Sequence, residues 1–252
     1  MRNFYYNNIE NEVEKMREIN VSTEELRNMT RNKYVASGSE ASIYKYNDDL
    51  AIRIYDIEEN VYCQTTGRII GKPLCKQMIE NLKIYQNNIK LTDFPIGIVK
   101  ENNIVVGQII KFYENAPTLT EFLKNHPELD PITYYLKVLD VLEELTKYNI
   151  CYEDVHGGNF LVVDDNIKLI DFSDHRVKIN ETYNELYYNM FQNFNAMVNK
   201  INFKVLHLED TYNRLLIPPH IKKDTQNLPA DFEEIRNMLK NLKKTKDKKS
   251  NR

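Results

Sequence analysis

Among the polar residues between Ile150 and Asp174, three have side-chain oxygens at spacings that could bring them into one site. Asp154 and Asn159 lie between two short apolar runs that favour strands, and Asp171 directly follows a third such run. A polar turn separates the second run from the third, which predicts a hairpin. We therefore expect Asp154, Asn159 and Asp171 to converge at one end of a small sheet.

Carboxylate and amide oxygens are the hard ligands that Mg²⁺ prefers, and such a site leaves coordination positions for water and nucleotide phosphates. Phosphoryl transfer also needs a carboxylate that orients the attacking hydroxyl. An ordinary β-meander with turn-forming Asp and Asn would explain each residue singly. Their spacing favours one shared site, whose oxygen atoms are suited to magnesium.

The same spacing resembles the protein-kinase superfamily. Asp154, Asn159 five residues later, two apolar strands and then Asp171-Phe172-Ser173 are similar to the catalytic loop and the metal-binding segment of kinases. The resemblance implies that Asp154 orients the acceptor hydroxyl, and that Asn159 and Asp171 bind the metal. Phe172 would pack beneath Asp171.

The chain departs from the usual kinase motifs at several positions. Tyr152-Glu153 replaces the His-Arg pair before the aspartate, and Ser173 replaces the glycine after the phenylalanine. The absent arginine usually pairs with an activation-loop phosphate, so we expect no such switch. His156 stands where serine/threonine kinases carry a lysine, and is expected to neutralise the transferring group. The loop is similar to the Asp-x-His-x-x-Asn loops of atypical bacterial and small-molecule kinases.

Two β-prone runs between Lys33 and Tyr46 are joined by the small-residue turn Ser37-Gly38-Ser39. This order resembles the glycine-rich loop of kinases, although of the three glycines usual in that loop only Gly38 is present. In the next strand, alternation puts Ala51 and Arg53 on one face. The resemblance implies that this face binds the nucleotide, with Arg53 in the place of the phosphate-binding lysine.

Further elements must position these groups. A helix from Pro73 to Asn88 should carry the carboxylate partner of Arg53, for which Glu80 is one candidate, and Glu58, Glu59 or no partner are the alternatives. Strands at 94–99 and 104–112 complete a five-stranded sheet. The stretch from Gln108 to Asn115 is then the expected hinge, whose backbone binds adenine.

The predicted fold is α+β, with the two lobes of a protein-kinase-like fold. We expect a helical lead-in over residues 1–32, a small antiparallel-sheet lobe over 33–115, a reduced and mainly helical large lobe over 116–242, and a basic disordered tail over 243–252. Capping signals at Ser22, Thr118 and Asp130 predict helix starts. The helices expected in the large lobe span about 130–148, 181–201, 208–216 and 231–243.

Composition sets the outer limits. The chain has 252 residues, 42% of them hydrophobic, and a formal charge of -3, which gives no whole-chain footprint for nucleic acid or membrane. No apolar run is long enough to span a bilayer, and the three cysteines lack metal-site or disulfide spacing. We expect a cytoplasmic monomer.

These observations predict a kinase that uses ATP and Mg²⁺, with a protein Ser/Thr hydroxyl as the favoured acceptor. A small-molecule kinase of the aminoglycoside or choline type is the alternative, because the chain has no room for a long activation segment. A pseudokinase acting as a nucleotide-binding or interaction module is the rival from another class. Arg53, the reduced glycine loop and the uncertain glutamate partner motivate it.

Overall fold

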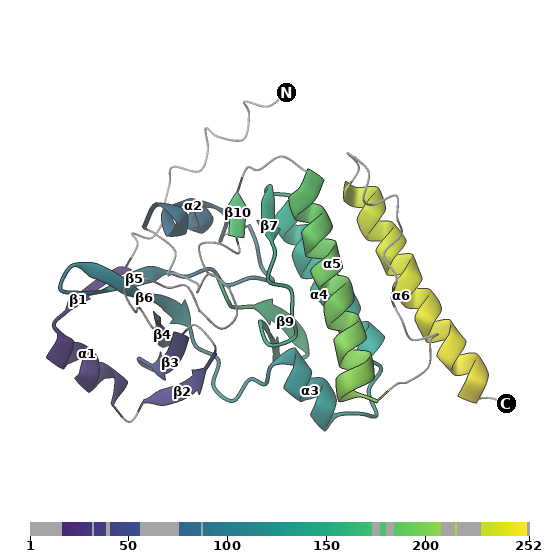
Figure 1. Ribbon diagram of the computed structural model, residues 1–252, viewed down its shortest axis with the longest axis horizontal. Helices are drawn as coiled ribbons and strands as arrows, with labels where there is room; N and C mark the ends of the chain where they lie inside the picture. Colours follow the sequence, from purple (N-terminus) through teal and green to yellow (C-terminus); the bar gives the residue numbers. More distant parts are fainter. Residues whose placement is uncertain are drawn as a thin grey trace, which may run out of the picture. The chain divides into compact units, whose positions relative to one another are not determined.

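The computed structural model describes residues 17–31, 33–38, 41–55, 76–86, 88–172, 177–179, 184–207, 215 and 228–250 (Figure 1). The fold is α+β, as predicted. The chain forms two compact units. The first contains Met1–Glu114 and Phe172–His175, and the second contains Asn115–Asp171 and Arg176–Arg252.

A six-stranded sheet dominates the first unit, with strand order β1-β5-β6-β4-β3-β2. Its strands are β1 (Arg17–Val21), β2 (Tyr34–Ser37), β3 (Ala41–Lys45), β4 (Leu50–Tyr55), β5 (Gly97–Glu101) and β6 (Ile104–Lys111). Strands β2 to β6 pair antiparallel, whereas β1 runs parallel to β5. The observed sheet therefore has one strand more than the five that the sequence predicted.

The additional strand lies where the sequence predicted a helical lead-in. Arg17–Val21 pairs in register with Gly97–Glu101, and Val21 is buried in the sheet's core cluster. Local helix propensity is a weak preference that such pairing overrides. The second predicted helix is correct: α1 (Thr23–Thr30) begins with a capping box between Ser22 and Glu25. Residues 1–16 lie outside the described part.

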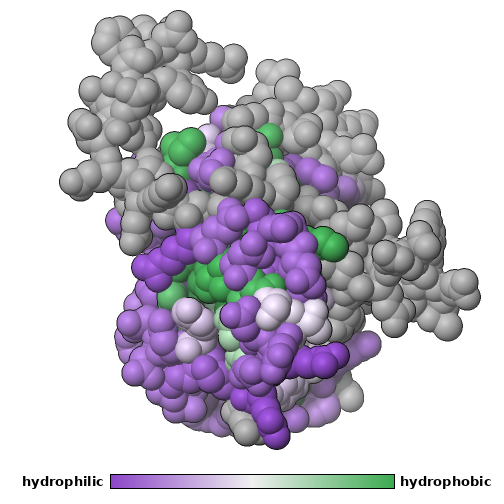
Figure 2. Space-filling view, turned by 90° about the vertical axis from the view of Figure 1, so that its left-hand side faces the viewer, coloured by the Kyte–Doolittle hydropathy of each residue, from purple (hydrophilic) through white to green (hydrophobic). Residues whose placement is uncertain are grey.

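The two faces of β4 are used as its alternation predicts. Leu50 and Ile52 join an apolar cluster that α1 partly covers with Leu26 and Met29, while the buried Ala51 and Arg53 belong to the opposite face. The other members of this cluster are Val21, Val99, Val106 and Ile109. Viewed from the side on which α1 lies, apolar residues gather in the middle of a largely hydrophilic face (Figure 2).

Two local features frame this sheet. Asn102 and Asn103 have φ values of 48° and 68°, as a two-residue hairpin turn between β5 and β6 requires. Helix α2 (Lys76–Gln86) buries Ile79 and Leu82 completely, as its apolar stripe predicts. The predicted helix start at Pro73 lies outside the described residues, as do Glu58 and Glu59.

Helices make up most of the second unit: α3 (Leu119–Asn125), α4 (Pro131–Thr146), α5 (Asn184–Lys200) and α6 (Leu228–Ser250), with a π-helical turn η1 (Ile201–Val205) after α5. The capping box at Thr118 and the N-cap at Asp130 are confirmed. Arg236 of α6 forms ion pairs with Asp140 and Glu143 of α4. Helices α4 and α6 lie side by side (Figure 1).

The carboxyl-terminal part differs from the prediction in the length of its last helix. Helix α6 continues to Ser250. The prediction of a disordered basic tail from residue 243 is therefore wrong for residues 243–250. Lysine is a good helix former, so this run extends the helix without a break. Of the helix expected over 208–216, only Leu215 lies within the described residues.

Two separate pairs of strands replace the single small sheet that we expected. Strand β7 (Ile150–Tyr152) pairs with β10 (Val177–Ile179), and β8 (Phe160–Val163) forms a hairpin with β9 (Asn166–Leu169). The hairpin turn has Asp164 and Asp165 at φ values of 48° and 61°. Among the described helices, none is both long and apolar enough to cross a membrane.

Candidate functional site

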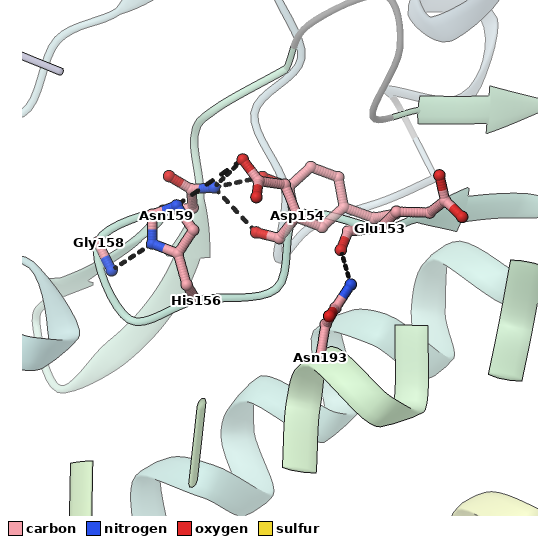
Figure 3. A network of polar contacts seen from close by, with 7 residues as sticks. Glu153, Asp154, His156, Gly158, Asn159 and Asn193 are labelled. Carbon is pink, nitrogen blue, oxygen red and sulfur yellow. Dashed lines mark hydrogen bonds and ion pairs between the residues drawn. The ribbon is translucent and has the colours of Figure 1, made fainter. Parts of the chain in front are cut away.

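The loop between β7 and β8 is organised around the buried side chain of Asn159 (Figure 3). Its amide nitrogen donates to the Tyr152 hydroxyl at 2.8 Å, to the Asp154 carbonyl at 2.9 Å and to Asp154 Oδ2 at 3.1 Å. A carbonyl and a carboxylate can only accept, so these contacts fix which end of the amide is the nitrogen. Asn159 Oδ1 accepts no hydrogen bond from the described residues.

The strand register brings Asp171 to the same end of the hairpin. Phe160 pairs with Leu169, and the Ile170 amide donates to the Asn159 carbonyl at 3.2 Å. Asp171 is the next residue, so it follows the backbone position that faces Asn159 across the hairpin. Asp154 belongs to the same group through its two contacts with the Asn159 amide. Asp154, Asn159 and Asp171 are thus brought together, although β7 is not part of that hairpin.

His156 is held by a backbone hydrogen bond. Its Nδ1 accepts from the Gly158 amide at 3.1 Å, so the ring proton of this neutral imidazole lies on Nε2. That nitrogen is 3.7 Å from Asp154 Oδ2, which is too long for a hydrogen bond. The side chain is half exposed. In this arrangement His156 presents Nε2 as its N–H donor, and its role toward the transferring group stays a prediction.

The loop between β7 and β8 also contacts α5 and α3, and the sequence did not predict these contacts. Asn193 of α5 donates to the Glu153 carbonyl, and Asn189 donates to the Glu153 carboxylate at 3.3 Å (Figure 3 shows Asn193). A Cβ at Gly157 would lie 2.3 Å from Thr120 Oγ1 of α3. These contacts hold the loop against α5 and α3. Asparagines in a helix carry no local signal of such a role, whereas the Gly157-Gly158 pair does indicate close packing.

A metal-binding role for this site depends on the ligand that comes with the metal. Within the described residues, no cluster of three or more His, Cys, Asp or Glu side chains could hold a metal ion. Asp171 and Asn159 offer one carboxylate and one amide oxygen. That set suits Mg²⁺, which is commonly bound by one or two carboxylates together with substrate phosphates and water. The donors therefore fit a metal that arrives with a nucleotide.

Cys151, next to Tyr152 in β7, has no part in this chemistry. Burial raises the pKa of its thiol to about 12, and the nearby Glu153 carboxylate acts in the same direction. The thiol therefore stays protonated at neutral pH and is a poor nucleophile.

The first unit places Arg53, Tyr55 and Gln108 together. The guanidinium carbon of Arg53 lies 4.9 Å from the centroid of the Tyr55 ring, and Arg53 is only 8% exposed. Gln108 lies opposite Arg53 in the register and is fully buried. Its amide nitrogen has no hydrogen-bond partner within the described residues, while its oxygen lies 3.4 Å from the Tyr55 hydroxyl.

The hinge prediction for Gln108 is wrong. Gln108 lies inside β6, between β4 and β5, so its backbone is committed to the sheet ladder and cannot hydrogen-bond adenine. Strand β6 continues to Lys111, and any hinge must begin after it. An apolar run alone does not show where a strand gives way to a connecting segment.

The small-residue turn is only partly described. Ser37 ends β2 and pairs with Ser42, and the Gly38 amide donates to the Ala41 carbonyl at 2.9 Å. That bond closes the turn, so the Gly38 amide is not available to a phosphate in this arrangement. Ser39 lies outside the described residues.

Phe172 is fully buried in the first unit. Its ring centroid lies 5.1 Å from that of Phe94, and its carbonyl accepts from the Tyr55 hydroxyl at 3.1 Å. The sequence predicted that Phe172 is a packing residue but did not identify these partners. Ser173 lies outside the described residues.

No family model matches the chain, and no curated protein matches it.

Proposed function

We propose that this chain is an ATP- and Mg²⁺-dependent phosphotransferase with a two-lobed protein-kinase-like fold. The observation that carries the proposal is the orientation of Asn159. Its amide nitrogen is turned toward Asp154, so Oδ1 is the end of the amide that can bind a metal, and Asp171 follows the residue whose amide bonds the Asn159 carbonyl. This arrangement supplies two oxygen ligands and a separate carboxylate for the acceptor hydroxyl.

Each residue has a distinct role in this proposal. Asn159 and Asp171 would hold the metal, which when bound neutralises charge on the nucleotide phosphates. Asp154 keeps one carboxylate oxygen on the Asn159 amide and orients the attacking hydroxyl with the other. His156 donates its Nε2–H to an oxygen of the phosphoryl group. The protein thus contributes positioning and charge stabilisation, without a covalent step of its own.

The first unit supports nucleotide binding in the same framework. Strands β2, β3 and β4 form a continuous antiparallel run, and Arg53 lies on its third strand, where kinases carry the phosphate-binding lysine. Arg53 and Ala51 are on one face, opposite to the cluster formed by Leu50 and Ile52. We propose that Arg53 binds the phosphates and that Ala51 lies against the base.

A protein Ser/Thr hydroxyl is the acceptor that we favour, and a small-molecule hydroxyl is the alternative. Incubating the protein with labelled ATP and a lysate, then separating proteins from metabolites, distinguishes them. Label in protein supports the first acceptor class, whereas label in the small-molecule fraction supports the second. Cytoplasmic location and a monomeric state stay predictions.

The rival proposal is a pseudokinase that acts as an interaction module. It is favoured by the stacking of Arg53 on Tyr55 and by the use of the Gly38 amide within its own turn. A thermal shift test decides whether the nucleotide binds. A ligand at a hundred times its dissociation constant stabilises a fold by about 2.7 kcal/mol. We expect ATP with Mg²⁺ to raise the melting temperature more than ATP with a chelator. No shift with millimolar ATP and Mg²⁺ would contradict the proposed function.

A further inference from the structure

The hydroxyl of Tyr152 makes the shortest of the three contacts to the Asn159 amide nitrogen. The two atoms are 2.8 Å apart, and the Tyr152 side chain is completely buried (Figure 3 shows the position of Asn159). Tyr152 stands immediately before Glu153-Asp154, at the position that the usual kinase motif gives to a histidine. Because Tyr152 and Asn159 are both buried, solvent cannot readily replace this hydroxyl.

The number of protons on the amide explains why this contact matters. Asn159 Nδ2 carries two protons, and its three acceptors belong to two residues. One proton serves the Tyr152 hydroxyl and the other is shared by the carbonyl and the carboxylate of Asp154. Two bonds in different directions fix the plane of the amide. With only Asp154 as a partner, the amide can rotate about the side-chain bonds.

We propose that Tyr152 is a positioning residue that sets the Asn159 amide so that its Oδ1 is presented to the metal. This inference rests on the proposed function, because it concerns the same metal site. Tyr152 itself does not touch the metal or the nucleotide. A hydrogen bond that orients a metal ligand typically changes metal affinity or activity by about 10- to 100-fold when it is removed.

The variant Tyr152→Phe removes the hydroxyl and keeps the ring. Mn²⁺ replaces Mg²⁺ as a metal that can be followed by electron paramagnetic resonance, in the presence of a non-hydrolysable ATP analogue. We expect the affinity for Mn²⁺ to fall by about 10- to 100-fold. Affinity for the analogue in the presence of a chelator should stay within about twofold of wild type, because metal-free binding of the analogue does not involve the Asn159 oxygen.

A matched control is available in the same unit. Tyr135 is also fully buried, and its hydroxyl donates to the buried Asn202 at 2.7 Å. Tyr135→Phe therefore removes a buried hydrogen bond between a tyrosine and an asparagine, without any contact to Asn159. It should lower the midpoint of chemical denaturation in the way that Tyr152→Phe does, yet leave Mn²⁺ affinity at the wild-type value.

A double-mutant cycle tests whether Tyr152 acts through Asn159. In an Asn159→Ala background, Tyr152→Phe should cause no further loss of Mn²⁺ affinity. The inference is overturned if Tyr152→Phe binds Mn²⁺ like wild type, if Tyr135→Phe loses as much, or if the loss persists without Asn159. A wild-type protein that binds no Mn²⁺ with the analogue would overturn the proposed function together with it, so the two failures are distinguishable.

Discussion

The Tyr55 hydroxyl donates to the backbone carbonyl of Phe172 at 3.1 Å, which ties strand β4 to the residue that directly follows Asp171. Tyr55 is 3% exposed and Phe172 is fully buried. Water therefore cannot replace this bond if the hydroxyl is lost. Together with the Phe94 ring, Tyr55 fixes the position of Phe172 in the first unit.

Tyr55→Phe should lower the free energy of unfolding by about 1–3 kcal/mol, because it leaves the buried carbonyl of Phe172 without this donor. Chemical denaturation measures the loss. Tyr34→Phe is the matched control: Tyr34 is exposed and its hydroxyl donates to Ser37 in the same unit. That change should stay within about 0.5 kcal/mol of wild type. Equal losses of stability in the two variants would show that the buried bond to Phe172 contributes no more than an exposed one.

Gly157→Ala should displace the loop that carries Asp154, because the new Cβ would lie 2.3 Å from Thr120 Oγ1. We expect a loss of about 1–3 kcal/mol in the free energy of unfolding and a lower turnover number. Thr120→Ala in the same chain removes the clashing oxygen and should restore part of both. In Gly38→Ala the nearest atom to the new Cβ is 3.9 Å away, so stability should change little. A Gly157→Ala protein as stable as wild type would contradict the close packing.

Asp171→Asn should abolish metal-dependent nucleotide binding and phosphoryl transfer together. The substitution nearly preserves shape but removes the charge of the proposed metal ligand. Isothermal titration with ATP, with and without Mg²⁺, measures the binding, and labelled ATP measures the transfer. Wild-type turnover in Asp171→Asn would remove Asp171 from the metal site.

Asp154→Asn should separate binding from chemistry. An amide oxygen at residue 154 can still accept from Asn159, so the loop geometry and the nucleotide affinity should be kept. Turnover should fall by about a hundred- to ten-thousandfold, because the orienting carboxylate acts only in the chemical step. Single-turnover kinetics and nucleotide titration of the same sample make the comparison. If affinity and rate fell equally, Asp154 would be a structural residue.

Arg53→Met should weaken nucleotide binding about ten- to a hundredfold if Arg53 is the phosphate anchor, since a charge-assisted hydrogen bond contributes about 1.5–3 kcal/mol. Arg53→Lys should recover part of this affinity because it restores the charge, but it replaces the planar group that stacks on Tyr55. ATP titration and melting temperatures of both variants test this. A lower melting temperature with unchanged ATP affinity would support the pseudokinase.

Local signals in the sequence were sufficient for much of the fold. Capping boxes at Ser22 and Thr118, the proline start of α4 and the turn at Asp164-Asp165 each follow from short-range chemistry, and each occurs as predicted. Long-range pairing was not predictable in this way. Nothing within Arg17–Val21 indicates β5 as its partner, and nothing within Ile150–Tyr152 indicates β10.

In the candidate site, too, local spacing was predictable and long-range contacts were not. The sequence identified Asp154, Asn159 and Asp171 by spacing, and the structure brings them together through the hairpin register and the Asn159 amide. The partners that hold them come from distant parts of the chain, such as Asn193 in α5 and Thr120 in α3. Gln108 was misplaced for another reason: strand periodicity shows which residues share a face but not where a strand ends.

The parallel pairing of β1 with β5 has a consequence for how the chain folds during synthesis. Residues 17–21 leave the ribosome long before their partner strand exists, since Arg17 pairs with Gly97. A contact between such distant residues carries a loop-closure cost that the intervening hairpins reduce as they form. Strand β1 should therefore join the sheet after β5 and β6 have paired, and as an edge strand it should exchange its amide hydrogens before β4 and β6 at the centre.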